Sequence, residues 1–318
     1  MKRKLVLTVS IVLILSLLAA CGSSPKNTPT LVPMAAPLPS PKPLPSSTPL
    51  PTSTPLPITT MDPSLQSFET MVDLGEHEMA LSCKGQGEPT VILGYENIGG
   101  FHFWNDGTLK DLKDISRTCR YTRIETTRKM YTTEDQVQEL HELLTQAGVP
   151  GPYVLVGHEI SGLNVLLYTY HYPTDVVGLV CVSCFTHILD NNIMDALGEE
   201  QPDESAAKKQ VRNFWAWDDY PDMINLLFRT SFAQARKVTS LGDLPFVVLA
   251  SGDFTYFPES WSSLGFDKIW FDSMDELSKL SSRGRMEIVP NNDITSIPYS
   301  DAVTKAIQEV VEAARQTP

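Results

Sequence analysis

Histidine and cysteine, the side chains most often used for acid–base and thiol chemistry, lie early in this chain. The last of its six histidines is His187, so none lies between that residue and the C-terminus. A serine or carboxylate nucleophile that needs a histidine base must therefore use His187 or an earlier one. Cys181 and Cys184 have the spacing of a dithiol redox motif, but they end an apolar stretch and do not open a helix. This placement argues against thioredoxin-like chemistry.

The charge of the chain is strongly acidic and unevenly distributed. Its 318 residues carry a formal net charge of −13 without a basic block, which excludes the nucleic-acid-binding class because phosphates need lysine and arginine as partners. From Ser64 onward there are 20 basic and 37 acidic residues, a net charge of about −17. A hydrophobic content of 42% is that of a globular protein, and roughly 255 residues suffice for one large domain.

The first 21 residues have the pattern of an export signal. Three basic residues, 2–4, precede an apolar run over 5–20 that ends in small residues. The last four residues, 18–21, resemble a bacterial lipobox, which implies that Cys21 becomes a lipidated N-terminus. We therefore predict a lipoprotein signal peptide over 1–21 and anchoring on the extracytoplasmic face of a bacterial cell-envelope membrane. The alternative is an ordinary cleaved signal with an incidental cysteine.

A proline-rich segment follows the signal. Thirteen of the 24 prolines lie between Pro25 and Pro63, among many serine and threonine residues. Such a composition cannot bury a core and favours extended, polyproline-like structure. We predict a disordered linker over 22–63 that holds the following domain up to about 100 Å from the membrane, at about 3.1 Å per residue.

The rest of the chain alternates between strand and helix patterns. Thr133 is the expected N-cap of a helix, with Gln136 three residues later and apolar residues at helical spacing up to Gly148. Further helices are expected over 160–172 and 300–315. Strands are expected over 67–75, 77–83, 90–94, 117–124, 153–156, 176–183, 245–250 and 285–289. This alternation predicts an α/β class with a mainly parallel sheet covered on both sides.

Residues 148–158, which run through a glycine–proline turn and an apolar strand into Gly157 and His158, resemble lipase/esterase-like members of the α/β-hydrolase superfamily. Residues 244–249 and 301–303 match later parts of the same family, and the likeness covers nearly all of 68–316. The resemblance implies an α/β-hydrolase domain over 64–318. It also implies a mainly parallel eight-stranded sheet flanked by helices, with a helical lid at about 186–243.

The resemblance also assigns positions to the catalytic residues, and two of them are changed. The family keeps its nucleophile in a Gly-x-Ser-x-Gly elbow, and the aligned residues 157–161 place Glu159 at the nucleophile position. The following helix N-terminus should favour an ionised carboxylate, which is a weak nucleophile. At the histidine position, after the last strand, the sequence has Asp293.

The remaining site positions are implied in the same way. Asp253 matches the acid that orients the family's histidine. The oxyanion loop contributes Glu96 and Asn97, and the neighbours of the nucleophile position are His158 and Ile160. A carboxylate at position 96 opposes negative charge where hydrolysis needs hydrogen-bond donors. Where relatives have a Tyr-Asp-Arg motif followed by a glycine-containing turn, this sequence keeps Tyr121 and Arg123.

Three functions are compatible with these changes. The first is a catalytically impaired binding or scaffold module. The second is an active hydrolase with a rearranged site, in which Ser161 or Ser183 works with His102, His158 or His187. The third is an acidic pocket that binds a small amine or a hard cation such as calcium, although no metal site is firmly indicated. Its ligands would be Glu96, Glu159, Asp253 and Asp293, which could equally be solvated acids at the rim of a disused pocket.

Aromatic and cysteine residues add two further expectations. In the lid, Trp215 and Trp217 either line a pocket for an apolar ligand or pack a lid helix onto the body. Cys83 and Cys119 fall on strands that resemble the family's second and fourth strands, which are neighbours in its sheet. The resemblance therefore implies a disulfide between them in an oxidising compartment, the alternative being two buried thiols.

Overall fold

The computed structural model describes residues 67–94, 104, 111–124, 131–215, 222–253, 259–262, 264–290 and 300–316. The signal peptide and linker predicted over 1–63 lie outside these residues. Within them, no helix is both long enough and apolar enough to cross a membrane.

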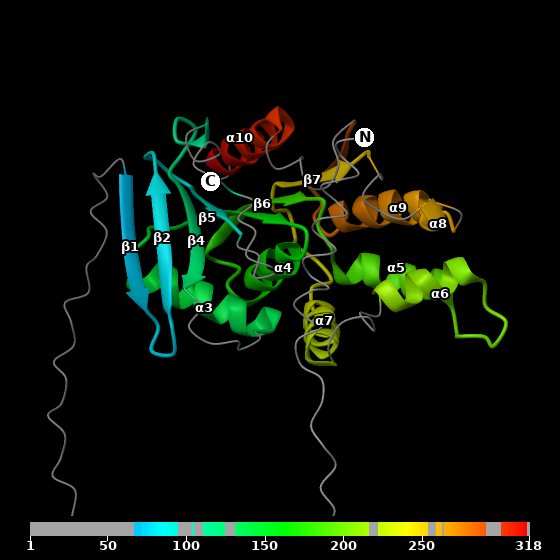
Figure 1. Cartoon of the computed structure of the whole chain (residues 1–318). Coiled ribbons are helices and arrows are strands. Elements are labelled where there is room, and N and C mark those ends of the chain that lie inside the picture. Colours follow the sequence, from blue (N-terminus) through cyan, green and yellow to red (C-terminus); the bar gives the residue numbers. More distant parts are fainter. Residues whose placement is uncertain are drawn as a thin grey trace, which may run out of the picture. The chain divides into compact units, whose positions relative to one another are not determined.

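A single eight-stranded sheet forms the centre of the domain, with the strand order β1-β2-β4-β3-β5-β6-β7-β8 (Figure 1). The β1–β2 and β2–β4 pairs are antiparallel, and every later pair is parallel. The strands are β1 Ser67–Asp73, β2 Glu78–Lys84, β3 Thr90–Leu93, β4 Thr118–Ile124, β5 Tyr153–His158, β6 Val176–Val182, β7 Phe246–Ser251 and β8 Gly284–Val289. The prediction of a mainly parallel sheet of eight strands is confirmed.

Helices cover both faces of the sheet. Figure 1 shows α10 on one face and α3 and α4 on the other. The helices are α3 Thr133–Gln146, α4 Ser161–His171, α5 His187–Leu197, α6 Ala206–Trp215, α7 Asp222–Ala235, α8 Glu259–Ser262, α9 Phe266–Ser278 and α10 Asp301–Arg315. Of these, α5, α6 and α7 belong to the predicted lid segment, 186–243.

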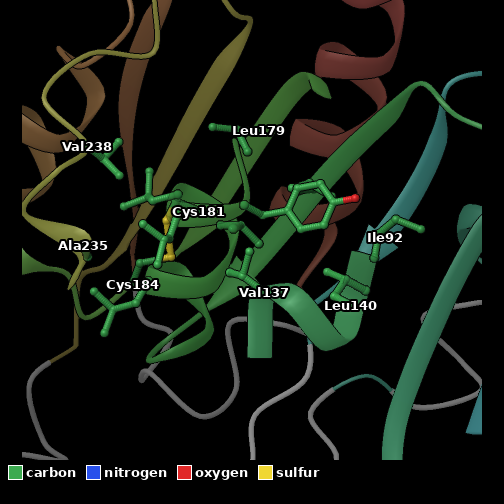
Figure 2. Close-up of a cluster of buried hydrophobic side chains, with 14 of the residues drawn as sticks. Ile92, Val137, Leu140, Leu179, Cys181, Cys184, Ala235 and Val238 are labelled. Atoms are coloured by element: carbon green, nitrogen blue, oxygen red, sulfur yellow. A yellow bond between two sulfur atoms is a disulfide. The ribbon is translucent and has the colours of Figure 1, made fainter. Parts of the chain in front are cut away.

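Alternating strand residues separate the core into two clusters. Val91, Val154 and Val180 face α10, where Ile307 and Val311 are fully buried. The intervening residues Ile92 and Leu179 point to the other cluster, which Figure 2 shows with Val137 and Leu140 of α3. Alternate residues of the strands, and the residues at helical spacing on α3 and α10, therefore pack against apolar partners.

The N-terminus of α3 differs by one residue from the expectation. Thr132, in extended conformation, is the N-cap; its hydroxyl accepts a hydrogen bond from the backbone N–H of Asp135, whose carboxylate accepts the N–H of Thr132 at 2.8 Å. Thr133 is buried, and its backbone N–H donates to the Ser231 hydroxyl of α7 at 3.1 Å. The predicted Thr133–Gln136 cap was wrong. Thr132 and Asp135, a pair with the same spacing one residue earlier, form the cap, and the Thr133 amide is bonded to Ser231 of α7.

Candidate functional site at the carboxyl end of the sheet

Glu159 forms the turn between β5 and α4. Its φ of +45° is in the left-handed region, which costs about 1–2 kcal/mol for a residue with a Cβ. Three backbone hydrogen bonds hold it there: its N–H donates to the Val182 carbonyl at 3.2 Å, and its carbonyl accepts from Gly162 at 3.1 Å and Phe185 at 2.9 Å. Strained residues of this kind persist only where their surroundings fix them, and they concentrate at functional sites.

Two glycines allow the strand and the helix to meet closely at this turn. A Cβ on Gly157 would lie 2.9 Å from a methyl carbon of Val165, and one on Gly162 would lie 2.4 Å from the Cβ of Cys184. Neither position has room for a side chain. The structure therefore has the sharp strand–turn–helix geometry in which a nucleophile elbow presents its central residue.

The two serines considered as replacement nucleophiles are fully buried and bonded to the backbone. The Ser161 hydroxyl accepts from the His158 N–H and donates to the His158 carbonyl, both at 2.8 Å. The Ser183 hydroxyl accepts from the Ser251 N–H at 3.1 Å. These bonds give both hydroxyls a structural role in the loops that follow β5 and β6.

The described histidines of this region are buried as well. His158 lies beneath Trp104, with ring centroids 6.3 Å apart, and Trp104 Nε1 donates to the Gly94 carbonyl at 2.8 Å. At the start of α5, burial and the nearby Arg236 guanidinium lower the pKa of His187 to about 4, against a smaller opposing effect of its hydrogen bond to the Val238 backbone. His102 lies outside the described residues.

Asp253 follows β7, the second strand along the sheet from β5. Its backbone N–H donates to the Ser251 hydroxyl at 3.3 Å, and that hydroxyl donates to the Asp253 carbonyl at 3.2 Å. With strands about 4.8 Å apart, β5 and β7 are roughly 10 Å apart across the sheet, and Asp253 lies beyond the end of β7. Glu159, Ile160 and Asp253 are each partly exposed at the carboxyl edge of the sheet, where α/β folds bind ligands.

Glu96, Asn97 and Asp293 lie outside the described residues, so the convergence of the four carboxylates stays a prediction. Among the residues that the structure describes, no group of three or more histidine, cysteine or acidic side chains could hold a metal ion. The described part of the site therefore offers single carboxylates and no assembled ligand set.

A buried ionic cluster at the end of β4 was not predicted. The Arg123 guanidinium bonds the Glu139 carboxylate of α3, and its Nε donates to His77 Nε2 at 3.3 Å. His77 Nε2 also lies 3.3 Å from the Glu139 carboxylate, and Arg123 Cζ lies 3.6 Å above the Tyr131 ring. The sequence signal for this cluster was Glu139 itself. It lies one helical turn before the core residue Leu143, and a carboxylate on that buried side of the helix needs a charged or hydrogen-bonding partner.

The structure shows whether Trp215 of the lid lines a pocket or packs the lid, which the sequence left open. Trp215 is buried, donates from Nε1 to Asp190 at 3.0 Å, and packs against Phe232, Trp261 and Phe185. It therefore packs the lid onto the body. Trp217 lies outside the described residues. A cavity of about 80 Å³ does exist nearby. Its walls come from α5, α6, α9 and the segment just before α9, and include Ile193, Leu197, Lys208, Val211, Leu264 and Phe266.

Both candidate cysteine pairs form disulfides. Cys83 and Cys119 face one another in the β2–β4 register and are bonded, as predicted. Cys181 and Cys184 are also bonded, across the turn that follows β6. Sequence spacing alone had not assigned a role to this second pair.

Comparisons with known proteins relate the chain to others mainly through its fold. No family model matches it. A curated protein of Hormonema carpetanum named "Probable transporter efuK" is 23% identical over 129 residues, which cover 36% of this chain and 18% of that protein. The chain thus spans less than a fifth of that relative's length.

Solved structures match over most of the chain at low sequence identity. A candidate lipase, lip1, from Acinetobacter baumannii AYE has a TM-score of 0.55 at 15% identity, covering 80% of this chain and 93% of its own. A loop variant of haloalkane dehalogenase DbeA from Bradyrhizobium elkanii has a TM-score of 0.54 at 10% identity, with 78% and 97% covered. An α/β-hydrolase enzyme from a sediment metagenome of the lagoon of Mar Chica has a TM-score of 0.50 at 12% identity, with 77% and 99% covered. Together with the sheet order and the strained turn at Glu159, these matches establish that the chain has the α/β-hydrolase fold.

Proposed function

We propose that this chain is an exported, lipid-anchored protein of α/β-hydrolase fold whose site does not hydrolyse and serves as a binding or scaffold module. The observation that carries the proposal is Glu159 at the strained turn between β5 and α4. The fold keeps the costly backbone geometry of a nucleophile, yet the side chain presented there is a carboxylate.

The chemistry of that carboxylate supports the proposal. Glu159 lies at the N-terminus of α4, where the helix dipole favours the ionised form and reduces nucleophilicity. An ester formed on it would need a base to activate water, and the sequence has Asp293 where the resemblance places a histidine. A base from elsewhere would have to be His187 or an earlier histidine, and His158 and His187 are both buried.

The rearranged serine site receives little support from the described residues. An acyl-accepting serine must be reachable by substrate and free to give its proton to a base. Ser161 and Ser183 are fully covered, and the Ser161 hydroxyl already donates to a backbone carbonyl. A hydrolase built on either serine would have to break the bonds that hold the loops after β5 and β6.

Anchoring through Cys21 belongs to the same proposal. A lipidated Cys21 and an extended linker would hold the domain on the extracytoplasmic face of the membrane. The disulfides Cys83–Cys119 and Cys181–Cys184 are consistent with an oxidising compartment. The predicted partners are therefore the membrane and a small ligand.

The test is ester turnover by the full-length chain. We expect p-nitrophenyl acetate and butyrate to be hydrolysed at the same background rate by the wild type, by Glu159→Ala and by Glu199→Ala, an exposed acid in the lid that serves as the matched control. Wild-type turnover that is lost in Glu159→Ala and kept in Glu199→Ala would overturn the proposal.

A cationic ligand is the second candidate. It is favoured by the partly exposed carboxylates Glu159 and Asp253 at one edge of the sheet, in a part of the chain with a net charge of about −17. A ligand that binds only the native state raises the melting temperature. Millimolar calcium, or a small alkylamine, should then raise it in the wild type and less in Glu159→Gln. An unchanged melting temperature with both ligands rejects this candidate.

A further inference from the structure

The Cys181–Cys184 disulfide closes the turn between β6 and α5, directly beside the strained turn at Glu159. Both cysteines are fully buried, and Figure 2 shows their bond among apolar side chains of the core. Between them lies Ser183, whose φ of +47° makes it the second described residue other than glycine with a positive φ. The turn at Glu159 and the turn at Ser183 thus each contain a residue in the left-handed region, and they are neighbours.

The disulfide turn supplies backbone partners to both sides of Glu159. Val182, inside the ring that the disulfide closes, accepts the Glu159 N–H at 3.2 Å. Phe185, the residue after Cys184, donates its N–H to the Glu159 carbonyl at 2.9 Å. The two peptide planes that define the φ and ψ of Glu159 are therefore each bonded to the disulfide turn.

Cys184 also fills the space under the first turn of α4. Its Sγ lies 3.5 Å from the Gly157 carbonyl oxygen, a contact and not a hydrogen bond because a disulfide sulfur carries no proton. A Cβ on Gly162 would lie 2.6 Å from the same sulfur. The sulfur is thus in direct packing contact with the strand before Glu159 and the helix after it.

The other disulfide shows why this placement matters. Cys83 and Cys119 are opposite one another within the β2–β4 ladder, so their bond links residues that strand pairing already holds. The last paired residue of β6 is Val182, and Cys184 lies beyond it. The second disulfide therefore ties Cys184, which lies beyond the ladder, to the paired strand residue Cys181, in a turn that the Ser183 N–H also holds by donating to the Leu249 carbonyl at 2.7 Å.

We infer that the Cys181–Cys184 disulfide is a positioning element for the candidate site. It fixes the turn over 181–185, and this turn fixes the positive φ of Glu159 through the bonds to Val182 and Phe185. The inference goes beyond the proposed function and does not depend on it, because it concerns the backbone that presents Glu159 whatever the carboxylate does.

The test is residue-resolved amide hydrogen exchange on the full-length protein. In Cys181→Ala/Cys184→Ala we expect exchange at the amides of Glu159 and Phe185 to become at least about tenfold faster, with Leu155 in the centre of β5 unchanged, because the opening is local. The matched control, Cys83→Ala/Cys119→Ala, should leave the Glu159 and Phe185 amides unchanged. Equal acceleration at Leu155 would indicate general destabilisation and overturn the inference, as would unchanged exchange at Glu159.

A second variant keeps the inference falsifiable if the double variant does not fold. Cys184→Ser opens the disulfide with almost no change in side-chain volume, so it should also speed exchange at Glu159. Unchanged exchange at Glu159 in this variant contradicts the inference. Either result leaves the ester-turnover test of the proposed function unaffected.

Discussion

At the scale of the residue, Glu159 combines a backbone suited to glycine with a charged side chain. Its φ of +45° is maintained by hydrogen bonds to the end of β6, the turn after it and the first turn of α4, and by close packing at Gly157 and Gly162. A residue that only connected a strand to a helix would be expected to be glycine or asparagine here. The strain is therefore an argument that the side chain is used.

Replacement of Glu159 by glycine should stabilise the protein. Relief of about 1–2 kcal/mol of left-handed strain is partly offset by the 0.5–1 kcal/mol that glycine adds to unfolded-chain entropy, so we expect a gain of up to about 1.5 kcal/mol. For a domain of this size, each kcal/mol corresponds to roughly 2–4 °C in melting temperature. Thermal unfolding monitored by circular dichroism measures it.

Ile160→Gly is the control for this substitution. Ile160 has a right-handed φ of −70° and packs against the core, so the same change should destabilise there. If both variants lose stability to a similar degree, the Glu159 backbone is not strained, and the argument from strain to function fails.

The position of Glu159 could be predicted from the resemblance of residues 157–161 to the family's elbow, because that motif is local: an apolar strand, a glycine and a helix follow one another directly. The cluster of His77, Arg123, Tyr131 and Glu139 could not be predicted, because these residues come from four separate segments. Their pairing depends on where the β1–β2 turn and α3 meet the end of β4. Sequence spacing alone does not contain that information.

At the scale of the element, α3 is joined to the sheet by this buried ionic cluster. Removing one partner of a buried ion pair leaves the other charge without compensation, at a cost of about 3–5 kcal/mol. Glu139→Gln should therefore lower the free energy of unfolding by roughly 3 kcal/mol. Lys268→Ala, which breaks an exposed pair with Asp272 on α9, should cost under about 1 kcal/mol. Urea denaturation of the two variants checks this, and equal losses would show that the buried cluster is not specially stabilising.

The attachment of α5 to the body should depend on pH through His187. Its pKa is lowered to about 4 from an ordinary value of 6.5, so the unfolded chain binds the proton more tightly. The stabilisation is fully present above pH 6.5 and is lost as the pH falls towards 4. Between pH 7 and 5 the loss should be about 2 kcal/mol.

Denaturation midpoints of the wild type and His187→Gln at pH 7 and pH 5 measure this loss. The variant should lose less stability than the wild type over the same interval. Asp190, on the same helix, has a pKa raised by burial and contributes with the opposite sign, but it is present in both proteins and cancels in the comparison. Identical losses would mean that His187 is exposed enough to be protonated in the folded state.

At the scale of the whole molecule, the order of strands and helices could be predicted because hydrophobic period and turn residues agree along most of 64–318. The mainly parallel sheet and the Cys83–Cys119 disulfide are both found. The Cys181–Cys184 disulfide and the packing role of Trp215 were left open. The disulfide depends on the conformation of the turn after β6, and the role of Trp215 on how the lid segment folds back onto the body; residue patterns determine neither.

The proposed linker over 22–63 and the proposed lipidation of Cys21 together imply that the protein is found in the membrane fraction. In a bacterial expression host, Cys21→Ala should abolish the incorporation of radiolabelled palmitate. It should also release the protein from the membrane fraction, because the apolar signal is removed on export and no lipid then anchors the chain. Cys83→Ala/Cys119→Ala should keep the label. Palmitate that persists in Cys21→Ala would show that the lipobox interpretation is wrong.

The central claim is that an α/β-hydrolase fold presents Glu159 where an activated nucleophile would stand. The most direct measurement is treatment of the full-length protein with a fluorophosphonate probe, followed by intact-mass and peptide analysis, because the probe needs no knowledge of the substrate. We expect no covalent adduct on the wild-type chain. A stoichiometric adduct on Ser161, Ser183 or Glu159 would contradict it and show that an active hydrolase site exists.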